Sequence, residues 1–230
     1  MTVISNPWHA LPSEPPFVLP EDRAILEEFN RRAGLKARVE TDLLPEPYVG
    51  RLDAPVVLLL LNPGIGGGEF ALHQNADFRD RVLRCHRQEA APYPNYYLDP
   101  VVTGDGARWN TRITRRLTAE FGTPAVAAGV AFLEYFPYHS RNFVHHRLRV
   151  PSQQFTLDLL RSALSRDAVI FITRGRTIWQ AALPELRGYP RAFSTRSVQN
   201  VVISPGNCPE GYEAARAALE RAARAEKLEK

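Results

Sequence analysis

The sequence predicts an α/β protein, a three-layer α/β/α sandwich whose central, mainly parallel sheet has four strands. Residues 56–61, VVLLLL, are six consecutive apolar residues, which is typical of a strand covered on both faces. Further apolar runs alternate with helical patterns along the chain, as in folds built from βαβ units. The chain has 230 residues, of which 44% are hydrophobic, and it shows no internal repeat or linker. We therefore expect a single domain over residues 1–230.

The predicted elements follow in chain order. Residues 1–20 are rich in proline and predict an extended N-terminal arm on the surface. We expect strands at residues 55–61, 129–136, 168–173 and 200–204. We expect helices at residues 20–34, 76–88, 107–121, 151–164, 176–186 and 210–227.

Composition limits the classes of partner. The two cysteines, Cys85 and Cys208, do not make a disulfide framework and fit a reducing compartment. The N-terminal residues lack the pattern of a signal peptide, and no apolar run is long enough to span a membrane. We therefore expect a cytoplasmic monomer with no membrane partner. A net charge of +4 permits a phosphate-bearing partner but does not require one.

Three strand ends carry polar residues followed by proline or glycine. Carboxyl ends of parallel strands lie at one edge of a sheet, where ligands bind in open α/β folds. Proline fixes the backbone near such a residue, and glycine lets the backbone approach a ligand closely. The sequence therefore predicts one crevice formed by Asn62-Pro63-Gly64, by residues 134–140 and by Ser204-Pro205-Gly206-Asn207.

These segments resemble a known family. PYVGRLDAPVVLLLLNPGIGGGE resembles the first motif of the uracil-DNA glycosylase superfamily, closest to the single-strand-selective monofunctional and mismatch-specific branches, which carry Gly-x-Asn-Pro-Gly. FLEYFPY resembles the strand whose end carries the family's base-reading Asn, and SPGNCPEGYEAARAAL resembles the last motif and its helix. The resemblance extends from about residue 47 to residue 220. It implies a DNA-repair hydrolase that flips a base out of DNA and hydrolyses its N-glycosidic bond.

Asn62 matches the family residue that positions the attacking water. An amide oxygen can hold a water against the sugar C1′ when the transition state resembles an oxocarbenium ion. The alternative is that Asn62 only closes the turn after the strand.

Glu134 departs from the family pattern, because an Asn that reads uracil stands at this place in the family. An ionised carboxylate offers acceptors only, so it fits two adjacent donors of a guanine-like edge, or a cytosine-like edge protonated at N3. Two alternatives remain. Glu134 could be a general acid or base whose pKa burial raises, or it could form a salt bridge with Arg141 or Arg174.

The last motif departs as well, because Val202 stands where the family has a His that stabilises the departing base. Valine cannot donate a hydrogen bond, and His139 is the candidate that could replace the donor, unless it caps a turn. We therefore expect weak or absent excision of uracil. Ser204 and Asn207 remain candidates for contact with the ligand.

The other candidates are aromatic and basic residues. Tyr97 and Tyr138 could contact an extruded base, the alternative being packing onto the core. Arg112, Arg141, Arg147 and Arg174 could bind the nucleic-acid backbone, the alternative being a solvated face. No metal-ligand spacing is present and an iron–sulfur cluster needs four cysteines, so we expect no metal and no cofactor.

Two functions follow from these observations. The first is a divergent DNA glycosylase that hydrolyses the N-glycosidic bond of a modified or non-uracil base. The alternative is a non-catalytic module that binds a nucleotide or a nucleic acid in the same pocket. The retained Asn62 favours the enzyme, and the departures at Glu134 and Val202 favour the binding module.

Overall fold

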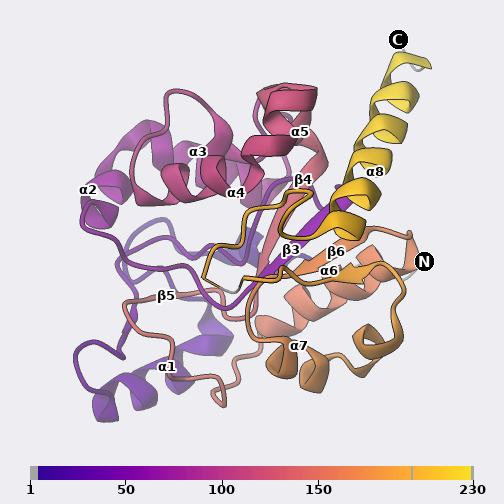
Figure 1. The fold of residues 1–230 in the computed structure, drawn as a ribbon. Coiled ribbons are helices and arrows are strands. Elements are labelled where there is room, and N and C mark those ends of the chain that lie inside the picture. The colour runs from indigo at the N-terminus through magenta and orange to yellow at the C-terminus, as the bar shows by residue number, and fades with distance from the viewer. Residues whose placement is uncertain (1–4, 198, 229–230) are drawn as a thin grey trace.

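The computed structural model describes residues 5–197 and 199–228, and it has the predicted α/β class (Figure 1). Its main sheet has the strand order β2-β4-β3-β6-β7. Strands β4, β3, β6 and β7 run parallel, and β2 pairs antiparallel with β4 at one edge. The five strands are β2 (Tyr48–Val49), β4 (Val130–Glu134), β3 (Val56–Leu60), β6 (Val169–Ile172) and β7 (Ala192–Phe193).

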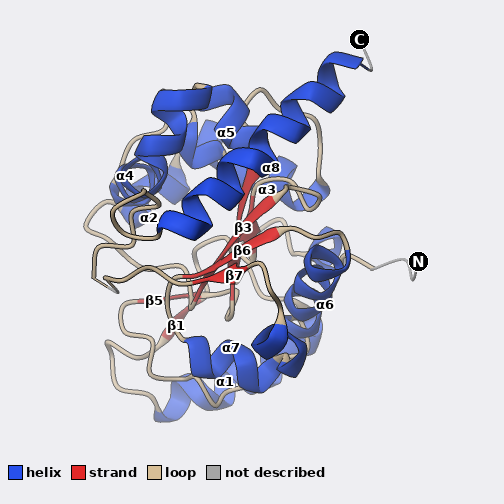
Figure 2. Ribbon diagram, turned by 45° about the vertical axis from the view of Figure 1, so that its right-hand side comes forward, coloured by secondary structure: helices blue, strands red, loops and turns tan. Residues whose placement is uncertain are grey.

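Helices cover both faces of this sheet. In Figure 2, α4, α5 and α8 lie on one side of the strands, and α6 and α7 lie on the other. The α-helices are α1 (Pro20–Arg32), α2 (Glu69–Gln74), α3 (Ala76–Arg87), α4 (Asp105–Phe121), α5 (Thr123–Gly129), α6 (Gln153–Ser165), α7 (Arg176–Ala182) and α8 (Pro209–Leu228). The 3-10 helices are η1 (Pro7–Ala10), η2 (Tyr96–Leu98) and η3 (Pro184–Gly188).

The core strands are buried because helices shield both of their faces. Residues Val56 to Leu59 of β3 are each no more than 2% exposed, and β3 lies between β4 and β6. The absence of polar alternation in this strand therefore matches its central position.

The prediction of a fourth strand at residues 200–204 is wrong. Val201, Val202 and Ile203 are buried, but this segment forms no strand. The sheet edge beside β6 is instead occupied by β7, which pairs with Ile170 and Phe171. An apolar run can be buried by packing alone, without hydrogen bonds to a neighbouring strand. The apolar pattern therefore could not distinguish a buried loop from a strand.

A small two-stranded sheet extends the structure at the carboxyl end of β4. Strand β1 (Val39–Glu40) pairs antiparallel with β5 (His139–Ser140). The side chain of Asn30 in α1 holds β1 through hydrogen bonds of 2.8 Å to both the N–H and the carbonyl of Val39. This sheet fixes the chain that follows β4, next to the carboxyl end of β3.

The N-terminal segment runs over the surface at residues 9–16, as predicted, but buried side chains anchor it before and after this stretch. Trp8, Phe17, Val18 and Leu19 are all buried. Residues 1–4 of the predicted arm lie outside the described residues.

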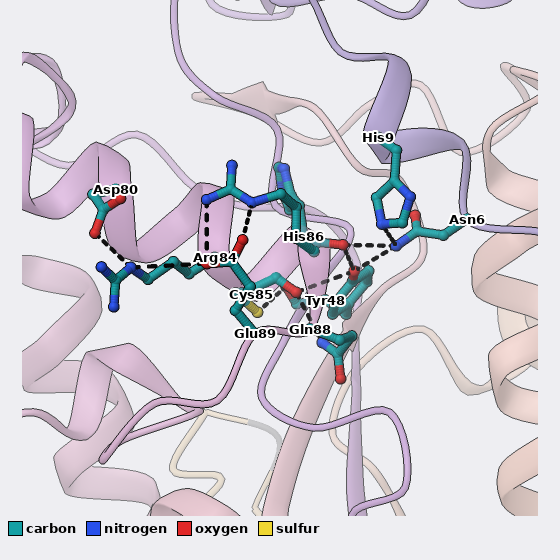
Figure 3. A network of polar contacts seen from close by, with 10 residues as sticks. Asn6, His9, Tyr48, Asp80, Arg84, Cys85, His86, Gln88 and Glu89 are labelled. Carbon is teal, nitrogen blue, oxygen red and sulfur yellow. Dashed lines mark hydrogen bonds and ion pairs between the residues drawn. The ribbon is translucent and has the colours of Figure 1, made fainter.

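Asn6 anchors this segment at the end of α3 (Figure 3). Its Nδ2 donates to the carbonyl of His86 at 2.7 Å and to the hydroxyl of Tyr48 at 3.2 Å. The Tyr48 hydroxyl donates to the same carbonyl at 2.9 Å, and Gln88, the left-handed C-cap, donates to the carbonyl of Cys85 at 2.8 Å. Carbonyls at a helix end have no partner within the helix, so these side chains satisfy them and join β2, α3 and the N-terminal segment.

Candidate functional site

The carboxyl ends of β3 and β4 open into one large cavity. Leu60 of β3 is the register partner of Glu134 in β4, and Asn62 lies two residues beyond Leu60. The cavity has a volume of about 810 Å³, and both Asn62 and Glu134 line it. The sequence therefore brings these two predicted site residues to the same place. The charged side chains that line the cavity are Glu46, Glu69, Asp105, Arg108, Arg112, Glu134, Arg141 and Arg174.

The amide of Asn62 is held by its nitrogen. Nδ2 donates to the carbonyl of Pro63 at 2.8 Å and to the hydroxyl of Ser140 at 2.9 Å. A carbonyl neighbour requires the nitrogen on that side, which fixes the orientation of the amide. Within residues 5–197 and 199–228 the oxygen Oδ1 accepts no hydrogen bond from the protein, so it is available to a ligand or a water.

Glu134 is buried without a partner. Glu134 is only 8% exposed, and its Oε2 has no hydrogen-bond partner among the described residues. Burial raises the pKa of this carboxyl well above its usual range, and the neighbouring Glu46 raises it further against the opposing effect of Arg174. Among the described side chains no ion pair joins Glu134 to Arg141 or to Arg174, so the predicted salt-bridge alternative is not formed.

Glu46 and Glu69 line the same cavity as Glu134, and we call these three residues the acidic wall. Glu46 and Glu69 are 4% and 5% exposed. Tyr97 donates to Oε1 of Glu46 at 2.7 Å. Burial raises the pKa of Glu46 to about 7, even though the nearby His73 lowers it.

His73 is the basic residue closest to the acidic wall. Its Nδ1 accepts the backbone N–H of Leu44 at 3.1 Å, so the ring proton is on Nε2. That nitrogen faces Oε1 of Glu69 at 3.5 Å and Oε1 of Glu46 at 3.9 Å. His73 therefore presents an N–H to the carboxylates and not a lone pair.

Glu46, His73 and His139 have side-chain atoms within 4.8 Å of one another, a spacing that a metal ion could bridge. Their hydrogen bonds do not fit a metal site. A ligating imidazole needs a free lone pair, whereas His73 carries its proton toward the carboxylates. Both ring nitrogens of His139 face backbone carbonyls, at 3.0 Å from Gly64 and 3.1 Å from Leu44.

The same contacts correct the prediction that His139 acts on the ligand. His139 is 1% exposed and is not among the residues that line the cavity. Burial lowers its pKa to about 4, with His73 as a second cause. Its place is structural, between the Gly64 loop and the chain at Leu44.

The prediction that Tyr138 contacts an extruded base is also wrong. It is fully buried, its hydroxyl donates to Asp22 at 2.6 Å, and the same hydroxyl accepts the N–H of Leu19 at 3.3 Å. These bonds fasten α1 and the N-terminal segment to the core, away from the cavity.

The prediction that Ser204 and Asn207 contact the ligand is wrong, because neither residue lines the cavity. The Asn207 side chain donates to the carbonyls of Asn200 and Val202 at 2.6 and 3.0 Å and accepts the N–H of Ser197 at 3.0 Å. All its polar atoms are used within its own turn. The segment that was expected to form a strand is therefore held by Asn207 instead.

Three of the four predicted backbone-binding arginines, Arg112, Arg141 and Arg174, line the cavity and are exposed, as is Arg108. We call these four residues the basic rim. Arg147 is exposed but does not line the cavity. The cavity thus combines buried carboxylates with exposed guanidinium groups.

Close approach of the backbone shapes two sides of the cavity. A Cβ on Gly66 would lie 2.1 Å from Oδ2 of Asp105, and that carboxylate accepts the N–H of Gly67 at 3.3 Å. A Cβ on Gly106 would lie 2.5 Å from the ring of Tyr97. Gly66 thus allows the loop after β3 to contact the start of α4, and Gly106 allows α4 to approach Tyr97.

Several lining residues were missed from the sequence. Trp109 and Phe143 are partly buried aromatic residues on the cavity surface. Glu69 begins the short helix α2, within a stretch expected to be loop, and Glu46 lies between two prolines with no periodic pattern around it. A Glu placed directly after the glycine loop was the available signal for Glu69.

Comparison with family models, curated proteins and solved structures gave no match. No helix in the described part of the chain has the length and apolar character needed to cross a membrane.

Proposed function

We propose that this protein is a divergent member of the uracil-DNA glycosylase superfamily, with a three-layer α/β/α sandwich, that hydrolyses an N-glycosidic bond of DNA. One observation carries the proposal. An amide with an unbonded oxygen, Asn62, and a buried unpartnered carboxyl, Glu134, line one cavity from adjacent parallel strands. This is the pairing of a water-holding residue with a base-facing residue that the reaction requires.

Asn62 acts on the water in this mechanism. Its amide nitrogen is committed to Pro63 and Ser140, which leaves the oxygen to accept a hydrogen bond from the nucleophile. The amide does not need to remove a proton at the start, because an oxocarbenium-like transition state makes C1′ strongly electrophilic. Glu134 contacts the base on the other side of the bond.

The base is one other than plain uracil. Uracil presents a carbonyl next to its N3–H, and Glu134, unlike the family Asn, repels that oxygen whenever it is ionised. The family His is replaced by Val202, which is 3% exposed and does not line the cavity. Since losing a single donor of this kind costs about 2.7–4 kcal/mol of transition-state stabilisation, excision of uracil is expected to be weak.

The basic rim holds the nucleic-acid backbone. Arg108, Arg112, Arg141 and Arg174 are exposed around the cavity, and guanidinium groups bind phosphate oxygens well. DNA is therefore the proposed partner, with the target base in the cavity and the phosphates outside it.

A non-catalytic nucleotide-binding module is the second candidate. The observation that favours it is the absence, among the described lining residues, of a histidine that could assist the departing base. In this case the cavity would hold a nucleotide without cleaving it.

An excision screen over oligonucleotides with single modified bases tests the proposal. Wild type should release at least one base, and Asn62→Ala should lose the release with little loss of stability. Asn200→Ala, an exposed residue outside the cavity, is the matched control and should behave as wild type. Tight binding of a nucleotide with no release from any substrate would favour the binding module.

A further inference from the structure

Among the described residues, no arginine or lysine forms an ion pair with the acidic wall. Glu46, Glu69 and Glu134 are each at least 92% buried and all line the cavity. Among the described residues, His73 is the only basic side chain within 4.0 Å of these carboxylates. Its Nδ1 accepts the N–H of Leu44, so only Nε2–H faces the carboxyl groups.

Buried carboxyl groups without a counter-ion are costly to ionise, so a cation that enters the cavity would offset this cost and bind favourably. Oε2 of Glu134 has no partner within the described chain and belongs to the lining, which makes it the direct contact for such a group. The exposed arginines of the basic rim, in contrast, favour an anion at the mouth of the same cavity. A ligand that matches both has a positive ring and a phosphate.

We propose that the cavity takes a nucleobase that carries a positive charge, that is, a base of DNA alkylated on a ring nitrogen. The proposal rests on the function proposed above and names its substrate class. The charged ring faces Glu134, Glu46 and Glu69, and the flanking phosphates contact the basic rim.

The chemistry of such a base accounts for the missing histidine. A neutral base leaves as an anion and needs a donor to stabilise it, whereas a cationic base leaves as a neutral molecule. Water adds its oxygen to C1′, the bond from C1′ to the base nitrogen breaks, and its electron pair neutralises the ring. The proton released by the water passes to the solvent.

The acidic wall also disfavours the departure of an anion. An anion such as that of uracil would form next to three buried carboxyl groups. The same residues that stabilise a bound cation therefore select against neutral bases that leave with a negative charge.

A pair of methylated cytosines separates charge from size. Base release is measured from oligonucleotides that carry 3-methylcytosine, which is cationic, or 5-methylcytosine, which is neutral and has the same number of heavy atoms. Oligonucleotides with 7-methylguanine and guanine form a second pair. An opposite charge within about 4–6 Å stabilises the charged form of a group by about 1–3 pKa units, which is a factor of about ten or more. Release of the cationic base should therefore be faster by about tenfold or more.

Glu134→Gln should reduce the ratio of the release rates of cationic and neutral bases. Glu69→Gln should also reduce this ratio, and it provides a second test if Glu134→Gln does not fold. Glu185→Gln, an exposed carboxylate away from the cavity, should leave the ratio unchanged. Binding of 3-methylcytidine and 5-methylcytidine to wild type is measured in parallel.

Four outcomes are distinct. Faster release of the cationic bases with a lower ratio in Glu134→Gln supports both proposals. Release of neutral bases alone overturns this inference and leaves the glycosylase standing. Tighter binding of 3-methylcytidine with no release supports the charge selectivity and overturns the hydrolytic function. Neither release nor a difference in binding overturns both.

Discussion

The hydroxyl of Tyr97 donates a 2.7 Å hydrogen bond to the buried carboxyl of Glu46. Both residues line the cavity, and the Tyr97 ring packs against Phe78 and Tyr96 with centroid distances of 5.8 and 4.8 Å. Tyr97 is thus fixed by the core on one side and fixes the acidic wall on the other. Its role in this arrangement is to position Glu46.

Removal of this donor tests the role. Tyr97→Phe leaves the ring in place but takes away a hydrogen bond to a buried carboxyl, and we expect a loss of about 1–3 kcal/mol in the free energy of unfolding. Chemical denaturation measures the change. Tyr93→Phe is the control, because no hydrogen bond of the Tyr93 hydroxyl is present among the described residues. Equal stabilities of the two variants would show that the bond to Glu46 contributes nothing.

Gly106→Ala should displace the ring of Tyr97 by steric overlap. The added Cβ would lie 2.5 Å from the ring, so the ring or α4 must move. Overpacking of this kind costs about 1–3 kcal/mol, and the shift should also weaken ligand binding. Gly188→Ala, whose Cβ would meet no atom within 4 Å, is the control for thermal denaturation. A normal Tm in Gly106→Ala would mean that this contact relaxes freely.

The sequence predicted the part of the site that follows strand geometry. Asn62 and Glu134 were found because each ends an apolar run, and parallel strands place such ends together. Glu46, Glu69 and Tyr97 depend on the packing of loops and short helices, which leaves no periodic signal. Their charge and hydrogen bonds decide what the cavity can bind, so the substrate class became visible only in the folded structure.

The fold shows the same division. The three long apolar runs of the sheet and the longer helices were predicted close to their observed bounds. The two-residue strands β1, β2, β5 and β7 were not, because pairing partners and not local sequence define them. The run at residues 200–204 was assigned to the sheet because burial and strand pairing produce the same apolar pattern.

Glu46 should make stability depend on pH in an unusual direction. Its pKa is raised from 4.5 to about 7 by burial, so the folded state binds the proton more tightly than the unfolded state. This contribution is fully present below about pH 4.5 and is lost as the pH rises to about 7. The free energy of unfolding of Glu46→Gln, relative to wild type, should therefore rise by about 1.4 kcal/mol per pH unit in this interval.

The relative measurement is needed because buried histidines act in the opposite sense. Burial lowers the pKa values of His86, His139 and His145 from 6.5 to about 4. Their contribution is present above about pH 6.5 and is lost as the pH falls toward 4. Denaturant titrations of both proteins at several pH values cancel these shared terms. A constant difference between variant and wild type would show that Glu46 is not protonated over this range.

Binding of DNA should weaken with salt in proportion to the phosphates contacted. We expect a slope of log K against log salt of about −0.7 to −0.9 per phosphate. Arg112→Ala and Arg141→Ala should each reduce the slope by about one such contact and weaken all sequences alike. Arg187→Ala, exposed and away from the cavity, is the control in fluorescence anisotropy. Affinity that does not change with salt would point to a small nucleotide as the ligand.

Replacement of Glu134 by Asn tests whether this position contacts the base. An amide offers one acceptor and one donor, which fits the N3–H and O4 of uracil, and unlike a carboxyl group it cannot ionise beside O4. Glu134→Asn should therefore bind uracil-containing DNA more tightly than wild type and release more uracil. The gain in rate should stay limited, because no side chain in the described lining replaces the family histidine, a donor worth about 2.7–4 kcal/mol. Glu134→Gln, with the same amide on a longer side chain, shows whether the length of the side chain matters. If neither variant changes the binding or the release of uracil, Glu134 does not face the base, and the proposed orientation of the ligand is wrong.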